Sequence, residues 1–151
     1  MLETKTVSEI INHIKSKDLS IKEVIEYYLN NIEKLNPKIN SIISIKNKNE
    51  IFEEAKKKNN TKFCGLPIAI KDLSDVVGFP TTYGYPGTKN YNPKKNSLFV
   101  DKLLEAGITI IGKTNTAELG VGGQTINRLF GPTSNVYDIS KCAAGSSGGA
   151  S

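Results

Sequence analysis

Two short apolar segments most constrain the fold of this chain. One is Leu66–Ile70, and the other is Ile108–Gly112. Each has the length and the apolar, partly β-branched composition of a buried strand. Between them, residues 97–105 carry apolar side chains at helical spacing, and a glycine follows as a helix-end signal. A strand, a helix and a second strand of like character predict a parallel βαβ unit and therefore an α/β fold.

The first sixty residues predict a helical lead-in. Thr6–Glu9 and Ser20–Glu23 both read as capping boxes, and each is followed by apolar residues at helical spacing. We expect Pro37 to end the second helix. A short β-branched strand is predicted over residues 39–45 and a polar helix over residues 47–58.

The composition excludes several classes of protein. The chain has 151 residues and a formal net charge of +5, but Arg128 is the one arginine among its 20 basic residues. A binder that reads nucleic acid through arginines is therefore not expected. His13, Cys64 and Cys142 cannot build a zinc site, so we predict no metal and no cofactor. The sequence shows no membrane span or signal peptide, and we expect a cytoplasmic protein with no membrane partner.

Lys71 is the first residue with candidate chemistry, because it directly follows a predicted buried strand. Loss of solvation disfavours the ammonium form, lowers the pKa and so favours a neutral amine that can accept a proton. The alternative is a structural lysine that extends to solvent or pairs with Asp72.

The second candidate is the glycine–serine stretch Gly145–Gly149. Glycines allow close approach of the backbone to a ligand, and two adjacent hydroxyls can relay protons or attack a carbonyl. The alternative is a flexible linker. A phosphate-binding loop is excluded because no Gly-Lys-Ser/Thr ends the stretch. A Ser-His-Asp triad is excluded because the single imidazole, that of His13, lies in the lead-in.

The order of the motifs along the chain resembles the amidase signature family of serine hydrolases. The resemblance covers essentially the whole chain, including the two lead-in helices. It implies the N-terminal part of that family's fold, in which strands of a mixed sheet are flanked by helices. The segments that carry it are Gly65–Asp72, Thr81–Gly84, Ala106-Gly107, Ile110–Asn115, Glu118, Asn127, Phe130–Thr133, Asn135 and Gly145–Gly149.

This resemblance implies a Ser–Ser–Lys triad, in which Lys71 is the catalytic lysine. Ser146 would be the bridging serine, on a cis peptide, and would pass a proton from the nucleophile to the lysine. The segment Gly120, Val121, Gly122 and Gly123 matches the part of the family that lines the acyl side of the substrate pocket. One departure is mild: Ala144 replaces the first of two glycines that usually precede the serine pair.

The nucleophile of the family lies further along, in an Asp-x-Gly-Gly-Ser stretch, beyond Ser151. We therefore expect this chain alone to hydrolyse no amide, because it lacks both the nucleophile and the oxyanion donors. We also expect it to fold poorly alone, because strands cut from a larger sheet leave unpaired edges. In this interpretation residues 1–60 are the lead-in and residues 61–151 begin the catalytic core of a single amidase domain.

Three functional hypotheses remain open from the sequence. The first is a general amidase that acts on a small-molecule amide, either as a monomer or as a homodimer. The second is the glutamine-hydrolysing subunit of a glutamyl-tRNA amidotransferase, with the other amidotransferase subunits as partners. The neutral run Gln124–Ile126 favours the first over the second. The third is a truncated, non-catalytic chain.

Overall fold

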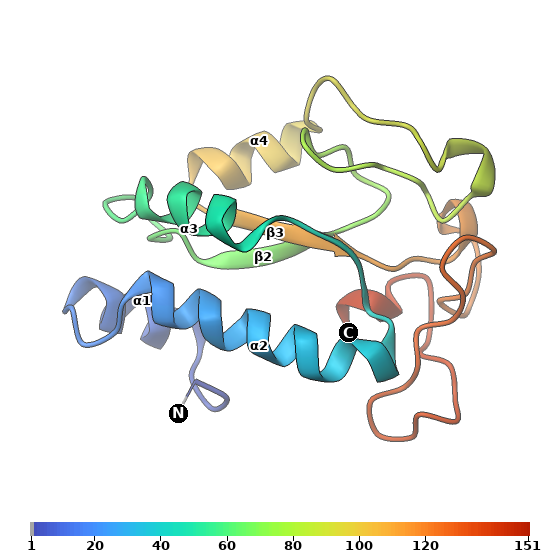
Figure 1. Ribbon diagram of the computed structural model, residues 1–151, viewed down its shortest axis with the longest axis horizontal. Helices are drawn as coiled ribbons and strands as arrows, with labels where there is room; N and C mark the ends of the chain where they lie inside the picture. The colour runs from blue at the N-terminus through green and yellow to red at the C-terminus, as the bar shows by residue number, and fades with distance from the viewer. Residues whose placement is uncertain (1) are drawn as a thin grey trace.

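The computed structural model describes residues 2–151 and shows an α/β fold (Figure 1). Four helices and three strands lie along the described chain, with the first helix followed directly by the second and strands and helices alternating from there, and three short 3-10 turns lie between or after them. The helices and strands are α1 (Val7–Lys15), α2 (Ile21–Ile39), β1 (Ile42–Ile45), α3 (Lys48–Lys56), β2 (Pro67–Lys71), α4 (Leu98–Glu105) and β3 (Thr109–Thr114). The 3-10 turns are η1 (Pro86–Thr88), η2 (Glu118–Gly120) and η3 (Gly148–Ala150).

The three strands form one mixed sheet in the order β1-β3-β2. β2 and β3 run parallel and α4 connects them, which confirms the predicted βαβ unit. β1 pairs with β3 in the antiparallel sense, with Ile45 opposite Gly112. The lead-in therefore contributes a strand to the same sheet as the following segment.

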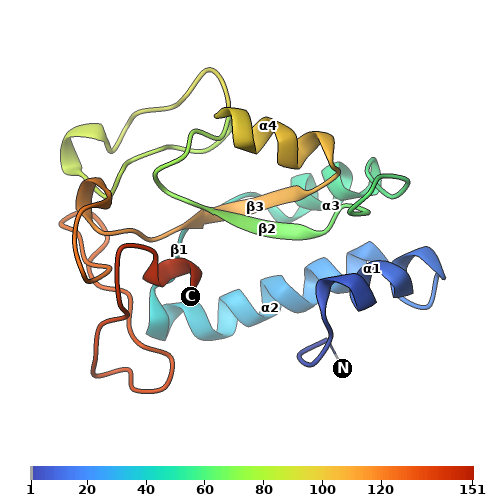
Figure 2. The same cartoon turned by 180° about the vertical axis from the view of Figure 1, so that it is seen from behind.

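The helices cover both faces of the sheet (Figures 1 and 2). α3 and α4 lie over one face, whereas α1 and α2 lie under the other, together with η3 near the C-terminal end of α2. Apolar side chains from all of these helices and from β2 and β3 form one core. Its fully buried members include Ile10, Val24, Ile25, Ile51, Ala55, Ile70, Val100 and Ile110.

The predicted capping boxes begin α1 and α2, but the predicted end of α2 is wrong. The helix runs past Pro37 to Ile39, because the N–H of Asn40 still donates to the carbonyl of Asn36 at 2.7 Å. Asn40 then adopts a left-handed conformation and ends the helix. The side-chain oxygen of Asn36 accepts from the N–H of Ile42 at 2.8 Å, so β1 begins there and not at residue 39.

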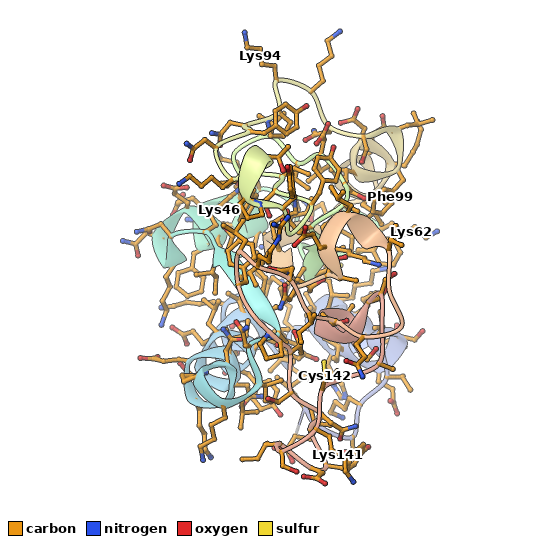
Figure 3. The ribbon with its side chains drawn as sticks, turned by 90° about the vertical axis from the view of Figure 1, so that its right-hand side faces the viewer. Lys46, Lys62, Lys94, Phe99, Lys141 and Cys142 are labelled. Atoms are coloured by element: carbon orange, nitrogen blue, oxygen red, sulfur yellow. The ribbon has the colours of Figure 1, made fainter. Side chains whose placement is uncertain are left out.

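The positive charge is spread over the molecule. In the side view, Lys94 and Lys141 point outward at opposite ends of the molecule (Figure 3).

None of the helices within residues 2–151 is long and apolar enough to cross a bilayer. Within the same residues, no group of three His, Cys, Asp or Glu side chains is placed to hold a metal ion.

Candidate active site

The structure brings Lys71 and the Gly145–Gly149 stretch together, although 75 residues separate Lys71 from Ser146. The Lys71 Nζ donates to the Oγ of Ser146 at 2.8 Å and to the Oγ of Ser147 at 2.7 Å. Both distances fit a hydrogen bond in either direction. A neutral amine can therefore donate to one hydroxyl and accept a proton from the other. The contact to Ser147 was not predicted, although its adjacency to Ser146 was visible in the sequence.

Lys71 has no counterion in the described part of the chain: no carboxylate there lies within salt-bridge distance of its Nζ. Asp72, the partner that the sequence offered, pairs with Lys113 instead. Partial burial of the amine lowers the pKa of Lys71 from its ordinary value of 10.5. A partly desolvated lysine whose hydrogen-bond partners are hydroxyls is suited to accept a proton.

Close packing fixes the Gly145–Gly149 stretch, which excludes the flexible-linker alternative. At Gly145 a Cβ would lie 2.5 Å from the backbone nitrogen of Gln124, and at Gly149 it would lie 2.5 Å from that of Asn115. Only glycine allows these approaches. The N–H of Gly145 donates to the carbonyl of Gly123 at 2.8 Å. The peptide bond between Gly145 and Ser146 is cis, as the family resemblance implied.

The segment that follows β3 holds Ser146 by its main chain. The carbonyl of Ser146 accepts from the Thr116 hydroxyl at 3.2 Å and from the Ala117 N–H at 3.3 Å. Thr125 supports the other side of the stretch, where its hydroxyl accepts from the Gly148 N–H at 2.6 Å. Sequence reasoning gave Thr116 and Thr125 no role, because their contacts arise only when the loops fold back on β3.

Two buried asparagines fix the loops around these contacts. The Asn127 Nδ2 donates to the Oδ1 of Asn115 at 2.7 Å and to the carbonyl of Thr116 at 2.9 Å. Its Oδ1 accepts from the N–H groups of Leu129 and Phe130 at 3.0 and 2.7 Å. In this loop region, side-chain amides satisfy main-chain hydrogen-bonding groups that a neighbouring strand would satisfy in a sheet.

The predicted substrate segment, Gly120 to Gly123, lies beside the glycine–serine stretch. Val121, Gly122 and Gly123 line a shallow hollow, and Val121 is 82% exposed. Gly120 has φ +75° and packs against Leu73. Lys71 and Ser146 do not line this hollow, and the segment is hydrogen-bonded to the candidate site through the Gly123 carbonyl and the Gly145 N–H.

A second lysine lies at the end of the neighbouring strand. Lys113 is fully buried, and its Nζ lies 2.9 Å from the Oδ1 of Asp72. Both residues belong to motifs noted in the sequence, where Asp72 was considered only as a partner for Lys71 and Lys113 was given no role. Burial lowers the pKa of Lys113, while the nearby Asp72 carboxylate raises it.

A sequence profile described as Amidase matches residues 23–151. The chain belongs to the amidase family. Among curated proteins, it is 36% identical over 154 residues to a glutamyl-tRNA(Gln) amidotransferase subunit of Thermoanaerobacter pseudethanolicus. That alignment covers 98% of this chain and 32% of the relative. It is 41% identical over 139 residues to the corresponding subunit of Methanosarcina barkeri, covering 89% of this chain and 28% of the relative.

Solved amidase structures share the fold. A bacterial aryl acylamidase of the amidase signature family superposes with a TM-score of 0.87 at 29% identity, over 96% of this chain and 32% of that one. The family resemblance and the α/β fold class are thereby confirmed. The chain spans about a third of the length of these amidases.

Proposed function

We propose that this chain supplies the lysine and the bridging serine of an active site that hydrolyses an amide bond. The observation that carries the proposal is the contact of the Lys71 Nζ with the Ser146 Oγ at 2.8 Å, with no carboxylate of residues 2–151 within salt-bridge distance of that amine. The comparisons support amide chemistry in general, because the chain belongs to the amidase family. The substrate class is a small-molecule carboxamide or amide.

In the proposed reaction, neutral Lys71 accepts the hydroxyl proton of Ser146, and Ser146 takes a proton from a nucleophilic serine outside these 151 residues. The nucleophile adds to the carbonyl carbon, and the relay then returns the proton to the leaving nitrogen as the C–N bond breaks. An acyl ester and an amine or ammonia result. Water then attacks the ester by the same relay and releases the acid.

Ser147 fits this scheme as the group that orients the amine. If the Lys71 Nζ donates to the Oγ of Ser147 at 2.7 Å, its lone pair is free to face the Oγ of Ser146. Val121, Gly122 and Gly123 would contact the acyl part of the substrate, as the family resemblance implies. Gly123 adjoins the site, since its carbonyl accepts a hydrogen bond from the Gly145 N–H.

The test uses the full-length protein and a panel of small amides. We expect Lys71→Ala and Ser146→Ala each to lower kcat/KM by about 10²–10⁴, the usual contribution of general acid–base catalysis. Ser140→Ala is the matched control, because its hydroxyl donates to the nearby Asp138 carboxylate on an exposed loop. Near-normal turnover in either of the first two variants would refute the assignment. Residues 1–151 alone are expected to show no turnover.

A second candidate function is the release of ammonia from glutamine within an amidotransferase. It is favoured by the 36% and 41% identity to the two amidotransferase proteins. The two functions differ in what the protein needs. A general amidase hydrolyses its amide alone, whereas a member of an amidotransferase complex requires its partners to convert a misacylated tRNA. Assays of the full-length protein with and without such partners separate the two.

A further inference from the structure

The buried ion pair between Lys113 and Asp72 has no part in the proposed proton relay. The side chains are 0% and 1% exposed, and the Lys113 Nζ lies 2.9 Å from the Asp72 Oδ1. The same Nζ donates to the carbonyl of Ser74 at 3.0 Å, to the hydroxyl of Thr81 at 3.1 Å and to the carbonyl of Pro80 at 3.3 Å. Lys113 is therefore surrounded by oxygen acceptors.

Stability alone does not explain such a pair. Removing two charges from water is costly, and apolar side chains of similar volume often replace a buried ion pair without loss of stability. Unlike an apolar contact, a hydrogen-bonded ion pair fixes the orientation of its members, because the Asp72 carboxylate must face the Lys113 amine at a set distance and angle.

The pair joins the ends of the two parallel strands on the face opposite to Lys71. Lys113 is in register with Ile70, and Thr114 is in register with Lys71. Because successive side chains on a strand alternate between faces, Lys71 points to one face and Lys113 to the other. Asp72 directly follows Lys71, so its side chain fixes the backbone from which Lys71 projects.

Hydrogen bonds continue from Asp72 to the support of Ser146. The Asp72 Oδ2 accepts from the hydroxyl of Thr82 and, at 3.0 Å, from its N–H. The next residue, Tyr83, donates its N–H to the Asp72 carbonyl at 3.1 Å and accepts from the N–H of Leu119 at 2.7 Å. Leu119 lies in η2, which begins directly after Ala117. The N–H of Ala117 donates to the carbonyl of Ser146. Asp72 thus directly follows Lys71 and is linked, through Thr82, Tyr83 and Leu119, to the segment that holds Ser146.

We propose that Lys113, acting through Asp72, is a positioning residue that sets the distance between Lys71 and Ser146. This inference rests on the proposed amidase function for its catalytic consequence. The expected change in the distance from the Lys71 Nζ to the Ser146 Oγ does not depend on that function, because it concerns only where the amine lies once the ion pair is removed.

The test compares Lys113→Met and the double variant Asp72→Asn/Lys113→Met in the full-length protein. The single variant leaves Asp72 buried without its partner and is expected to lower the urea midpoint of unfolding. The double variant replaces the pair by neutral groups of similar size, so its midpoint should return towards that of the wild type. Lys58→Met is the control: Lys58 is partly buried, and its Nζ donates to the Ile108 carbonyl, before the other end of β3.

Two readouts separate positioning from stability. Crystal structures of the double variant should show the Lys71 Nζ displaced from the Ser146 Oγ to beyond hydrogen-bond distance. Its kcat, normalised to folded enzyme, should remain at least about tenfold below wild type, while KM changes less than about threefold. Lys58→Met should retain both the kcat and the distance.

The proposal is overturned if the double variant keeps the Lys71–Ser146 contact, or if its kcat recovers together with its stability. A wild-type protein that hydrolyses no amide would instead refute the proposed function. In that case the crystallographic distance alone decides whether Lys113 positions Lys71.

Discussion

Lys71 is the last residue of β2, Lys113 is the last but one of its parallel neighbour β3, and burial lowers the pKa of both. Their surroundings differ. Lys71 touches two hydroxyls on one face of the sheet, whereas Lys113 touches a carboxylate on the other face. A lysine with a carboxylate partner keeps its proton and acts as a fixed charge. A lysine with hydroxyl partners can release its proton, which is what the proposed reaction requires.

The comparison shows that desolvation alone does not mark a catalytic lysine. Lys71 is only partly buried, whereas Lys113 is fully buried, so the more desolvated lysine is the one paired with a carboxylate. The distinguishing feature is the chemistry of the partner. In this fold, the chain places the carboxylate of Asp72 directly after Lys71 and then turns it towards the other lysine.

The largest expected effect is on stability. Lys113→Met in the full-length protein should lower the free energy of unfolding by about 3–5 kcal/mol, because it strands a buried carboxylate. Lys71→Met should change it by less than about 1 kcal/mol, because no charge loses its partner. Urea unfolding of both variants measures the difference. Equal losses would remove the distinction between the two lysines.

The next effect is a pH dependence of the rate. The proposed mechanism needs neutral Lys71, so kcat/KM should rise about tenfold per pH unit and level off below pH 10.5, because burial lowers the pKa of Lys71. The Ser147→Ala variant should keep this rise of kcat/KM with pH, whereas the residual activity of Lys71→Met should lack it. A rise that persists in Lys71→Met would assign the titration to another group.

The same pKa shift has a consequence for stability. The folded pKa of Lys71 lies below its unfolded value, so the protonated amine is disfavoured in the folded protein. That penalty is present in full below the folded pKa and is relieved as pH rises towards 10.5. The free energy of unfolding of the wild type, minus that of Lys71→Met, should therefore increase with pH over this range, as measured by urea unfolding at several pH values. A constant difference would contradict the shift.

A smaller effect is expected at Ser147. Ser147→Ala removes one of the two hydroxyl partners of Lys71 and should lower kcat by about tenfold or less, the worth of a single hydrogen bond. Steady-state kinetics on the full-length protein measure it. A loss as large as that of Ser146→Ala would mean that Ser147, and not Ser146, passes the proton.

The smallest effect concerns Thr116, which supports Ser146. Thr116→Val keeps the shape of the side chain but removes the hydroxyl that donates to the Ser146 carbonyl at 3.2 Å. We expect kcat to fall about fivefold, while Thr116→Ser, which keeps the hydroxyl, stays near wild type. If the two variants behave alike, the hydroxyl has no role in holding Ser146.

Local patterns predicted most of the fold. The capping boxes of α1 and α2 and the apolar runs of β2 and β3 are features of neighbouring residues, and each appears where it was expected. The errors lie where tertiary contacts override local preference. α2 continues past Pro37 because the Asn36 carbonyl and side chain both find partners beyond the proline.

The candidate site was predictable only in part. Lys71 was visible from its place after a buried strand, and Ser146 from its glycine neighbours and the family resemblance. The contacts of Ser147, Thr116 and Lys113 depend on the register of β2 against β3 and on how the loops fold back, which no local pattern encodes. The pairing of Lys113 with Asp72 was missed for the same reason, since Asp72 is adjacent in sequence to the other lysine.

The asparagine contacts described above have a spectroscopic consequence. Between Asn115 and Ser151 the described elements are two 3-10 turns of three residues each, so this region adds little helix or strand signal to the far-UV circular dichroism of the protein. Hydrogen exchange should report the opposite. The N–H groups of Leu129 and Phe130, both bonded to the Asn127 Oδ1, are expected to exchange slowly in the full-length protein. A region that adds little to the spectrum would then be among the slowest to open.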